Sequence, residues 1–182
     1  YYDETYKFKS AKYALPVNIK EPDFSEGETM LTFGQVQDDF NSFESAVYNN
    51  SHFERLIDME MLTRFMLVNE LVLNTELGHP KSIFLYRENI NHMSSKYTFG
   101  PVWDFDWGTF QKGVEYMIVN ESLWYGYLFQ YPEFKTAIKE RWSETKATLE
   151  DVQQYIEDLI PYLEESNAAN IKMWPLTNQH TN

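Results

Sequence analysis

Cysteine is absent from the 182-residue sequence, which excludes disulfide bonds, thiolate zinc sites and cysteine nucleophiles. No apolar run approaches the roughly 18 residues that a membrane-spanning helix needs, so we expect no membrane span in this chain. The sequence also lacks an HExxH pair, a Walker loop and a Gly-x-Gly-x-x-Gly loop. The common sequence signatures of zinc, mononucleotide and dinucleotide sites are therefore missing.

Basic residues are few: 15 Lys and Arg stand against 28 Asp and Glu, which gives a formal net charge of −13. A field of this sign repels phosphate backbones, so we expect no nucleic-acid partner. An anionic substrate such as a nucleotide would need divalent cations as partners. Hydrophobic residues make up 43% of the sequence, which indicates a folded domain with a core rather than a disordered chain.

The N-terminal part of the chain mixes short extended pieces with turns. Ala14 to Lys20 is typical of an extended segment beside a proline, and Glu21-Pro22-Asp23 indicates a turn. We expect residues 1–32 to form an N-terminal extended segment that packs on the main body or belongs to a preceding lobe. The sequence starts with Tyr1 rather than Met and shows no signal peptide, so we expect a further N-terminal portion in the precursor.

Two helices are predicted in the first half of the chain by apolar residues at helical spacing. The first covers Gln35 to Tyr48, and the second begins after Asp58, a good N-cap residue. Asn69 interrupts the apolar stripe of the second helix, at a position where an apolar residue is expected. The stripes consist of Val36, Phe40, Phe43 and Val47 in the first helix and of Leu62, Phe65, Met66, Val72 and Leu73 in the second.

A β-hairpin and further helices complete the predicted fold. Residues 83–86 and 97–103 are strand-like and are joined by a polar, turn-like stretch, which indicates an antiparallel hairpin. Downstream, one helix is expected to begin at Pro132, and another to begin at a capping box at Thr148 and to end or kink at Pro161. The fold class is therefore α+β, mainly helical with a small antiparallel hairpin. Residues 176–182 are expected to form a flexible tail.

Asp104 and Asp106 follow the second predicted strand and are the first candidates for chemistry. Side chains at i and i+2 of an extended segment point the same way, so both carboxylates could face one cation such as Mg²⁺. The flanking Trp103 and Trp107 would shield that site and strengthen the electrostatics within it. Gly108 would let the backbone leave sharply. The alternative is a solvated pair of carboxylates that caps a turn or a helix.

Asn74 and Glu76 lie at the end of the second predicted helix and just beyond it, and they are the next candidates. Glu76 could act as a general base or could ligate a metal. The alternative is that Asn74 caps the helix and that Gly78-His79-Pro80 forms the turn. Cap residues are far commoner than catalytic residues, so the pattern alone favours this alternative.

Three runs of residues in this order and spacing resemble the CotH family, the spore coat protein H family of kinase-like proteins. They are Leu67 to Glu76, Pro80 to Tyr86, and the specific run Gly-Pro-Val-Trp-Asp-Phe-Asp-Trp from Gly100 to Trp107. The resemblance covers about residues 35–175. It implies that residues 33–175 form a CotH-like helical domain, similar to the C-terminal lobe of an atypical kinase-like fold.

The resemblance implies an activity: phosphate transfer from ATP to a protein hydroxyl, with Mg²⁺ or Mn²⁺ as the metal. It implies that Asp104 and Asp106 bind the metal, and we expect Trp103 and Trp107 to line the nucleotide-binding surface. It also implies a location, because a CotH-type protein of this kind is expected to be exported or to lie at the cell surface.

The catalytic loop departs from the family pattern at two positions. The residue that matches the family's catalytic base is Glu76 rather than Asp, with Asn74 supporting the same loop. Ser82 stands where kinase-like sites often have Asn. A longer side chain shifts the carboxylate by about one bond length, and misplacement of that order can cost on the order of 10²-fold in rate.

A second hypothesis keeps the scaffold without the chemistry. On this hypothesis the chain is a non-catalytic binding module of an exported bacterial surface protein. An aromatic cleft at Trp103, Trp107 and Trp124 would bind a glycan or a protein partner by stacking and burial. The two hypotheses differ in ATP dependence, since only the first predicts metal-dependent nucleotide binding.

Overall fold

The computed structural model describes residues 5–25, 30–78, 81–110, 116–121 and 123–175 of the chain. The chain divides into two compact units, Tyr1–Arg141 and Trp142–Asn182. The described part is mainly helical with two small antiparallel sheets, which confirms the predicted α+β class and adds one sheet to it. The elements of the first unit up to its second hairpin are β1 (Lys7–Lys9), β2 (Pro16–Asn18), α1 (Phe33–Tyr48), the 3₁₀ helix η1 (Phe53–Arg55), α2 (Met59–Leu71), the 3₁₀ helix η2 (Thr75–Gly78), β3 (Leu85–Tyr86) and β4 (Thr98–Phe99).

Helix α1 begins two residues before the predicted start because a capping box fixes its N-terminus. Gln35 donates its backbone N–H to the Thr32 side chain, and the Gln35 side chain accepts from the Thr32 backbone at 2.8 Å. The face that carries Phe40, Phe43 and Val47 is buried, as the helical spacing predicted. This face supplies one wall of the hydrophobic core.

Helix α2 supplies the facing wall of the core. Asp58 caps it, because its carboxylate accepts a 3.0 Å hydrogen bond from the Met61 N–H, which confirms the predicted N-cap. Leu62, Phe65 and Met66 are buried along it, as predicted. The helix ends at Leu71, so the last two members of the predicted stripe lie beyond it and belong to the loop that follows.

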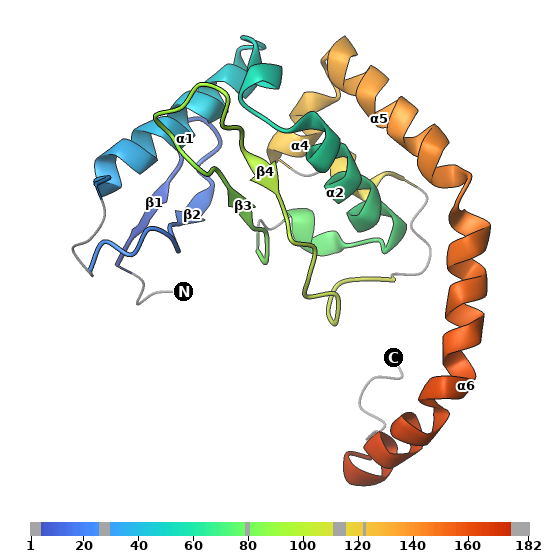
Figure 1. Cartoon of the computed structure of the whole chain (residues 1–182). Coiled ribbons are helices and arrows are strands. Elements are labelled where there is room, and N and C mark those ends of the chain that lie inside the picture. Colours follow the sequence, from blue (N-terminus) through green and yellow to red (C-terminus); the bar gives the residue numbers. More distant parts are fainter. Residues whose placement is uncertain (1–4, 26–29, 79–80, 111–115, 122, 176–182) are drawn as a thin grey trace. The chain divides into compact units, whose positions relative to one another are not determined.

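The predicted hairpin forms between α1 and α2 (Figure 1). β3 and β4 are antiparallel, and Leu85 pairs with Phe99. Tyr97 packs on Phe43 of α1 with ring centroids 4.6 Å apart, and Phe99 packs on Phe65 of α2 at 5.5 Å. β4 stops before Pro101, which has no N–H to continue the ladder, so the strand is shorter than the predicted 97–103.

A polar network ties the hairpin to α1. Arg87 pairs with the Asp39 carboxylate at 2.6 Å, and the Tyr97 hydroxyl donates to the other oxygen of the same carboxylate at 2.6 Å. The side chains of Arg87 and Asp39 are only 7% and 17% exposed, so water screens this ion pair weakly. Burial, followed by the hydrogen bond to Asp39, raises the pKa of Tyr97 far above its ordinary value.

The N-terminal segment forms the β1–β2 hairpin, which was not predicted from the sequence. β1 and β2 are antiparallel, with Phe8 opposite Val17. The buried carboxylate of Glu44 on α1 accepts hydrogen bonds from the Ser10 hydroxyl and, at 2.6 Å, from the Lys12 backbone N–H. This hairpin therefore packs against α1 through a satisfied buried carboxylate as well as through apolar contact.

The β3–β4 hairpin is followed by α3 (Ile118–Glu121), α4 (Leu123–Leu128) and α5 (Pro132–Lys146). The first unit ends within α5, at Arg141. Tyr125 and Leu128 of α4 and Phe134 and Ile138 of α5 are buried in the same core. α5 begins at Pro132, as predicted.

The second unit contains α6 (Leu149–Met173), in which no residue is buried. The predicted capping box at Thr148 is wrong, because the Thr148 side chain makes no cap hydrogen bond and its hydroxyl donates to the Thr145 carbonyl. The helix also does not end at Pro161 but continues to Met173. Among the helices of the described residues, none combines the length and the apolar character needed to cross a membrane.

Candidate functional site

The structure brings the two candidate segments together, although more than twenty-five residues separate them in the sequence. The Thr75 backbone N–H and hydroxyl both donate to the Gly108 carbonyl, at 2.9 and 2.8 Å. The Phe110 N–H donates to the Val72 carbonyl at 2.6 Å. The chain that follows Asp106 therefore runs along the loop that carries Glu76.

Gly108 is the point of closest approach between these two segments. It has a φ of +75°, which favours glycine. A Cβ atom at this position would lie 3.0 Å from the Thr75 hydroxyl oxygen and 3.2 Å from Cγ of Glu76. Gly108 therefore has the conformation that a sharp exit of the backbone requires, and the chain two residues after Asp106 lies directly against the Glu76 side chain.

Asn69, the polar interruption in the apolar stripe of α2, supports the loop that carries Glu76 through hydrogen bonds to Asn74. Its amide donates to the Phe65 carbonyl at 2.8 Å, and its Oδ1 accepts from the Asn74 amide at 2.8 Å. Asn74 in turn accepts the Glu76 backbone N–H at 3.0 Å. Asn69 is only 2% exposed, so these bonds satisfy a polar side chain that is otherwise costly to bury.

Asn74 contributes to the ends of two helices. Its backbone N–H donates to the Asn69 carbonyl at 2.9 Å and so satisfies a carbonyl at the C-terminus of α2, as the capping alternative expected. Asn74 also precedes η2 and accepts the N–H of the second η2 residue, Glu76. The predicted turn at Gly78-His79-Pro80 lies partly outside the described residues, because the structure describes only Gly78 of the three. The cap role and a supporting role for the loop are compatible, since the hydrogen bond that caps η2 also fixes Glu76.

Glu76 itself is largely enclosed, with 9% of its surface exposed. Within the described part of the chain, no hydrogen bond reaches its carboxylate. Its backbone N–H is held by Asn74, and its carboxylate is the part of the residue that remains available to a ligand. Its proposed catalytic role stays a prediction.

Asp104 does not have the geometry that the sequence predicted. Its φ is +65°, in the left-handed region, so the backbone around it is not extended and the rule that i and i+2 share a face does not apply. The Asp104 carboxylate instead accepts a hydrogen bond from the Ser82 hydroxyl. The neighbouring indole of Trp103 donates to the Ser82 carbonyl at 2.9 Å and its ring packs on Phe84.

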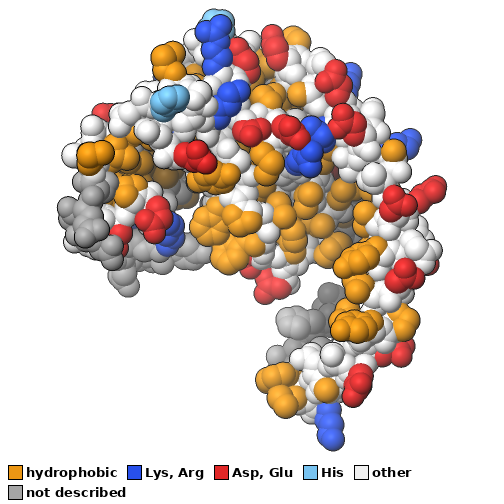
Figure 2. All heavy atoms as spheres, viewed as in Figure 1, with side chains coloured by type: hydrophobic (Ala, Val, Ile, Leu, Met, Phe, Trp, Pro, Cys, Tyr) orange, Lys and Arg blue, Asp and Glu red, His pale blue; other side chains and the backbone are white. Residues whose placement is uncertain are grey.

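The segment of residues 103–107, called the acidic segment here, is open to solvent rather than enclosed. Asp104 and Asp106 are both exposed, and Trp103 and Trp107 are 49% and 66% exposed. The two indoles are therefore largely exposed and do not shield the carboxylates as expected. Figure 2 shows hydrophobic side chains gathered in the middle of its face, over the β3–β4 hairpin and the chain that follows it.

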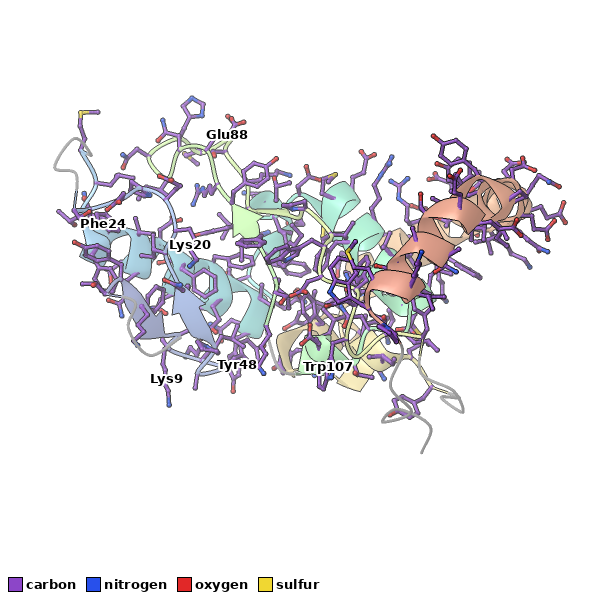
Figure 3. All side chains as sticks on the ribbon, turned by 90° about the horizontal axis from the view of Figure 1, so that it is seen from below. Lys9, Lys20, Phe24, Tyr48, Glu88 and Trp107 are labelled. Carbon is purple, nitrogen blue, oxygen red and sulfur yellow. The ribbon has the colours of Figure 1, made fainter. Side chains whose placement is uncertain are left out.

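Basic side chains of the N-terminal hairpin lie apart from this segment. Figure 3 labels Lys9, Lys20 and Trp107, and the two lysines lie toward the N-terminal hairpin while Trp107 lies on another part of the molecule. Trp124, the third aromatic residue of the predicted cleft, lies in a stretch whose side chains are not described. Among the described residues, no three acidic or histidine side chains come together as a metal cage.

Two supporting contacts could not be predicted from the sequence. Ser82 meets Asp104 across 22 positions, and no local pattern of the sequence shows that contact. Glu70, on α2, accepts the backbone N–H groups of Ile118 and Val119 at 3.2 and 3.1 Å, and so caps α3 with a carboxylate. The C-terminal turn of α2 therefore anchors the chain on both sides of the segment that the structure leaves undescribed.

Comparison with known proteins supports the resemblance that the three sequence runs indicate. The family model described as CotH kinase protein matches residues 6–182, so the match includes the N-terminal hairpin as well as the helical part. Searches of the curated proteins and of the solved structures each found no match. The match extends over nearly the whole chain, and the chain belongs to the CotH kinase family.

Proposed function

We propose that this chain is a phosphotransferase domain of the CotH type, which transfers phosphate from ATP to a protein hydroxyl with Mg²⁺ or Mn²⁺ as the metal. Membership in the family supports a kinase-like domain. The observation that carries the proposal further is the contact at Gly108, which joins the acidic segment to Glu76. A metal-binding segment and a base must lie together for phosphoryl transfer.

The residues present fit a divalent metal that arrives with its nucleotide. The donors that this segment offers are oxygen atoms, those of the exposed carboxylates of Asp104 and Asp106. Mg²⁺ prefers such hard ligands and usually takes one or two carboxylates, with waters and substrate phosphates completing its shell. When bound, the metal would neutralise charge on the phosphates.

The other residues have roles that follow from their positions. Glu76 would orient the acceptor hydroxyl and accept its proton, and Asn74 would hold the Glu76 backbone in place. Trp103 and Trp107 would offer exposed ring faces to the nucleotide. The likeness of the helical part to the C-terminal lobe of an atypical kinase belongs to the same proposal.

A second candidate function is a non-catalytic binding module of an exported or cell-surface protein. The observation that favours it is the exposure of the two indoles, each of which presents apolar ring area to a partner. Such a surface fits a protein partner or a glycan. The presence of Glu76 in place of the family's Asp also favours this alternative.

The experiment that separates the two functions is the thermal midpoint of the whole chain with and without ATP and Mg²⁺ or Mn²⁺. A ligand at about 100 times its dissociation constant stabilises the folded state by about 2.7 kcal/mol, which moves the midpoint by several degrees. We expect a shift that needs both metal and nucleotide and is lost in Asp104→Ala and Asp106→Ala. Asp151→Ala on α6 makes the same change in charge outside the site and should keep the shift.

No shift in the wild-type chain would contradict the phosphotransferase proposal and favour the binding module. A shift that persists in both aspartate variants would place the nucleotide elsewhere on the molecule. Nucleotide binding without phosphate transfer to any protein would support a scaffold that has kept its ligand and lost the reaction.

A further inference from the structure

Two residues in left-handed backbone conformations meet at the acidic segment. Ser82 has a φ of +54° and Asp104 a φ of +65°, and neither is glycine. Residues other than glycine adopt this region only at a cost in conformational energy, and they persist there where the surroundings hold them. Asp tolerates the conformation better than Ser does, so the strain at Ser82 is the less expected of the two.

Ser82 contacts both residues of the Trp-Asp pair, and it does so through different atoms. Its hydroxyl donates to Oδ2 of Asp104, while its carbonyl accepts the Trp103 indole N–H at 2.9 Å. The side chain and the main chain of one residue therefore fix two consecutive side chains of the acidic segment. Phe84, two residues further along, packs on the same Trp103 ring with centroids 5.1 Å apart.

We propose that Ser82 is a positioning residue that fixes the direction of the Asp104 carboxylate. The inference rests on the proposed metal role of Asp104. It adds Ser82, from the chain before β3, as the residue on which that role depends. An exposed carboxylate on a two-bond side chain samples several rotamers in water. A hydrogen bond from a residue that is anchored by its own carbonyl selects one of them, and it leaves the second carboxylate oxygen for a cation.

Hydrogen-bond partners of this kind tune metal affinity without touching the metal. Removing the group that orients a ligating side chain typically weakens metal binding by about 10–100-fold. The expected effect at Ser82 is therefore a loss of metal affinity that is separate from any loss of folded structure. Because the effect is on affinity, it can be measured without phosphate transfer.

Because φ is positive at Ser82, the hydroxyl can be removed there without adding backbone strain. Ser82→Gly deletes the hydroxyl and suits the backbone, since glycine adopts φ > 0 at no steric cost. Ser82→Asn also suits this region and returns a side-chain N–H donor for the carboxylate. Ser94→Gly is the matched control, because Ser94 lies in the β3–β4 loop and its hydroxyl contacts His92 instead.

The measurement is the Mn²⁺ dissociation constant of the full chain, with and without ATP, beside the thermal midpoint of each metal-free variant. We expect Ser82→Gly to bind Mn²⁺ about 10-fold or more weakly at a nearly unchanged midpoint, Ser82→Asn to recover most of the affinity, and Ser94→Gly to match the wild type. Recovery by Ser82→Asn is an outcome that a purely structural role of Ser82 does not produce.

Wild-type affinity in Ser82→Gly would overturn the inference and leave the proposed metal site standing. An equal loss in Ser82→Gly and Ser82→Asn, with lowered midpoints in both, would also overturn it, because Ser82 would then matter only for folding. A wild-type chain that binds no Mn²⁺ in either condition would instead remove the proposed function itself, and the two failures are thereby distinguished.

Discussion

The side-chain amide of Asn74 donates a 2.8 Å hydrogen bond to Oδ1 of Asn69, and both side chains are buried. Through this bond the last turns of α2 hold the loop that carries Glu76. A buried amide that loses its partner pays a desolvation cost of about 1–3 kcal/mol. The pair therefore couples the stability of the core to the geometry of the candidate site.

The first prediction is a double-mutant cycle on this pair. Asn69→Ala and Asn74→Ala should each lower the free energy of unfolding by about 1–3 kcal/mol. The first leaves the buried Asn74 N–H without its acceptor, and the second leaves Oδ1 of Asn69 without its donor. The double variant should be less destabilised than the sum, by about 0.5–3 kcal/mol, as urea unfolding measures. Asn91→Ala, at an exposed position, serves as the control and should change stability by less than about 0.5 kcal/mol. Additive effects of the two core variants would show that the hydrogen bond contributes nothing.

The second prediction concerns two glycines. Gly108→Ala should lower the free energy of unfolding by at least about 1 kcal/mol, because φ is +75° and the new Cβ would press on Thr75 and Glu76. Gly34→Ala, near the start of α1, has nothing within 4 Å of the new Cβ and should raise stability by about 0.4–1 kcal/mol. Thermal unfolding of the two variants measures both signs. A neutral Gly108→Ala would mean that the acidic segment shifts freely away from Glu76.

The third prediction compares two arginines that differ in burial. Arg87→Met should cost about 3–5 kcal/mol, because it leaves the Asp39 carboxylate nearly buried without its cation. Arg64→Met breaks an exposed pair with Glu60 and should cost about 0–1 kcal/mol. Denaturant unfolding of both variants gives the comparison, and equal costs would show that water reaches the Asp39 pair.

The fourth prediction is a loss of stability at alkaline pH. Burial raises the pKa of Tyr131 from 10.0 to about 12, so the folded state favours the protonated phenol. The stabilisation is complete below pH 10 and is lost as the pH rises through about 12, because the unfolded chain releases the proton first. Tyr131→Phe should flatten the fall of the thermal midpoint between pH 10 and 12. Tyr162→Phe, at an exposed position of α6, should leave the slope as it is, and an identical slope in Tyr131→Phe would refute the assignment.

Local signals in the sequence were enough to predict the elements that form the core. Asp58 caps α2 because its short carboxylate reaches the N–H three residues on, and that relation is visible in one dimension. The apolar spacing in α1 and the strand-like run that begins at Tyr97 are local as well. The N-terminal hairpin was missed because the acceptor that holds it, Glu44, lies more than thirty residues away on another element.

At the candidate site, the residue types could be predicted from the sequence, but their geometry could not. The residue types at Asp104, Asp106 and Glu76 suggested chemistry, and the chain does bring their segments together. The geometry at Asp104 could not be predicted, because its left-handed backbone depends on Ser82 and on the turn after β4. Asn69 was noticed as an anomaly, but its purpose appears only when Asn74 is placed beside it.

The link between the Glu76 loop and the acidic segment is made largely by main-chain atoms: the Thr75 N–H to the Gly108 carbonyl and the Phe110 N–H to the Val72 carbonyl. Substitution at a position such as Val72 therefore leaves the link in place, whereas adding or removing one residue between Gly108 and Phe110 shifts it out of phase. Gly108 is restricted by its close approach to Thr75 and Glu76, but other side chains in this stretch can change without breaking the main-chain link. The number of residues between the two hydrogen bonds therefore constrains the link more than most of the side chains do.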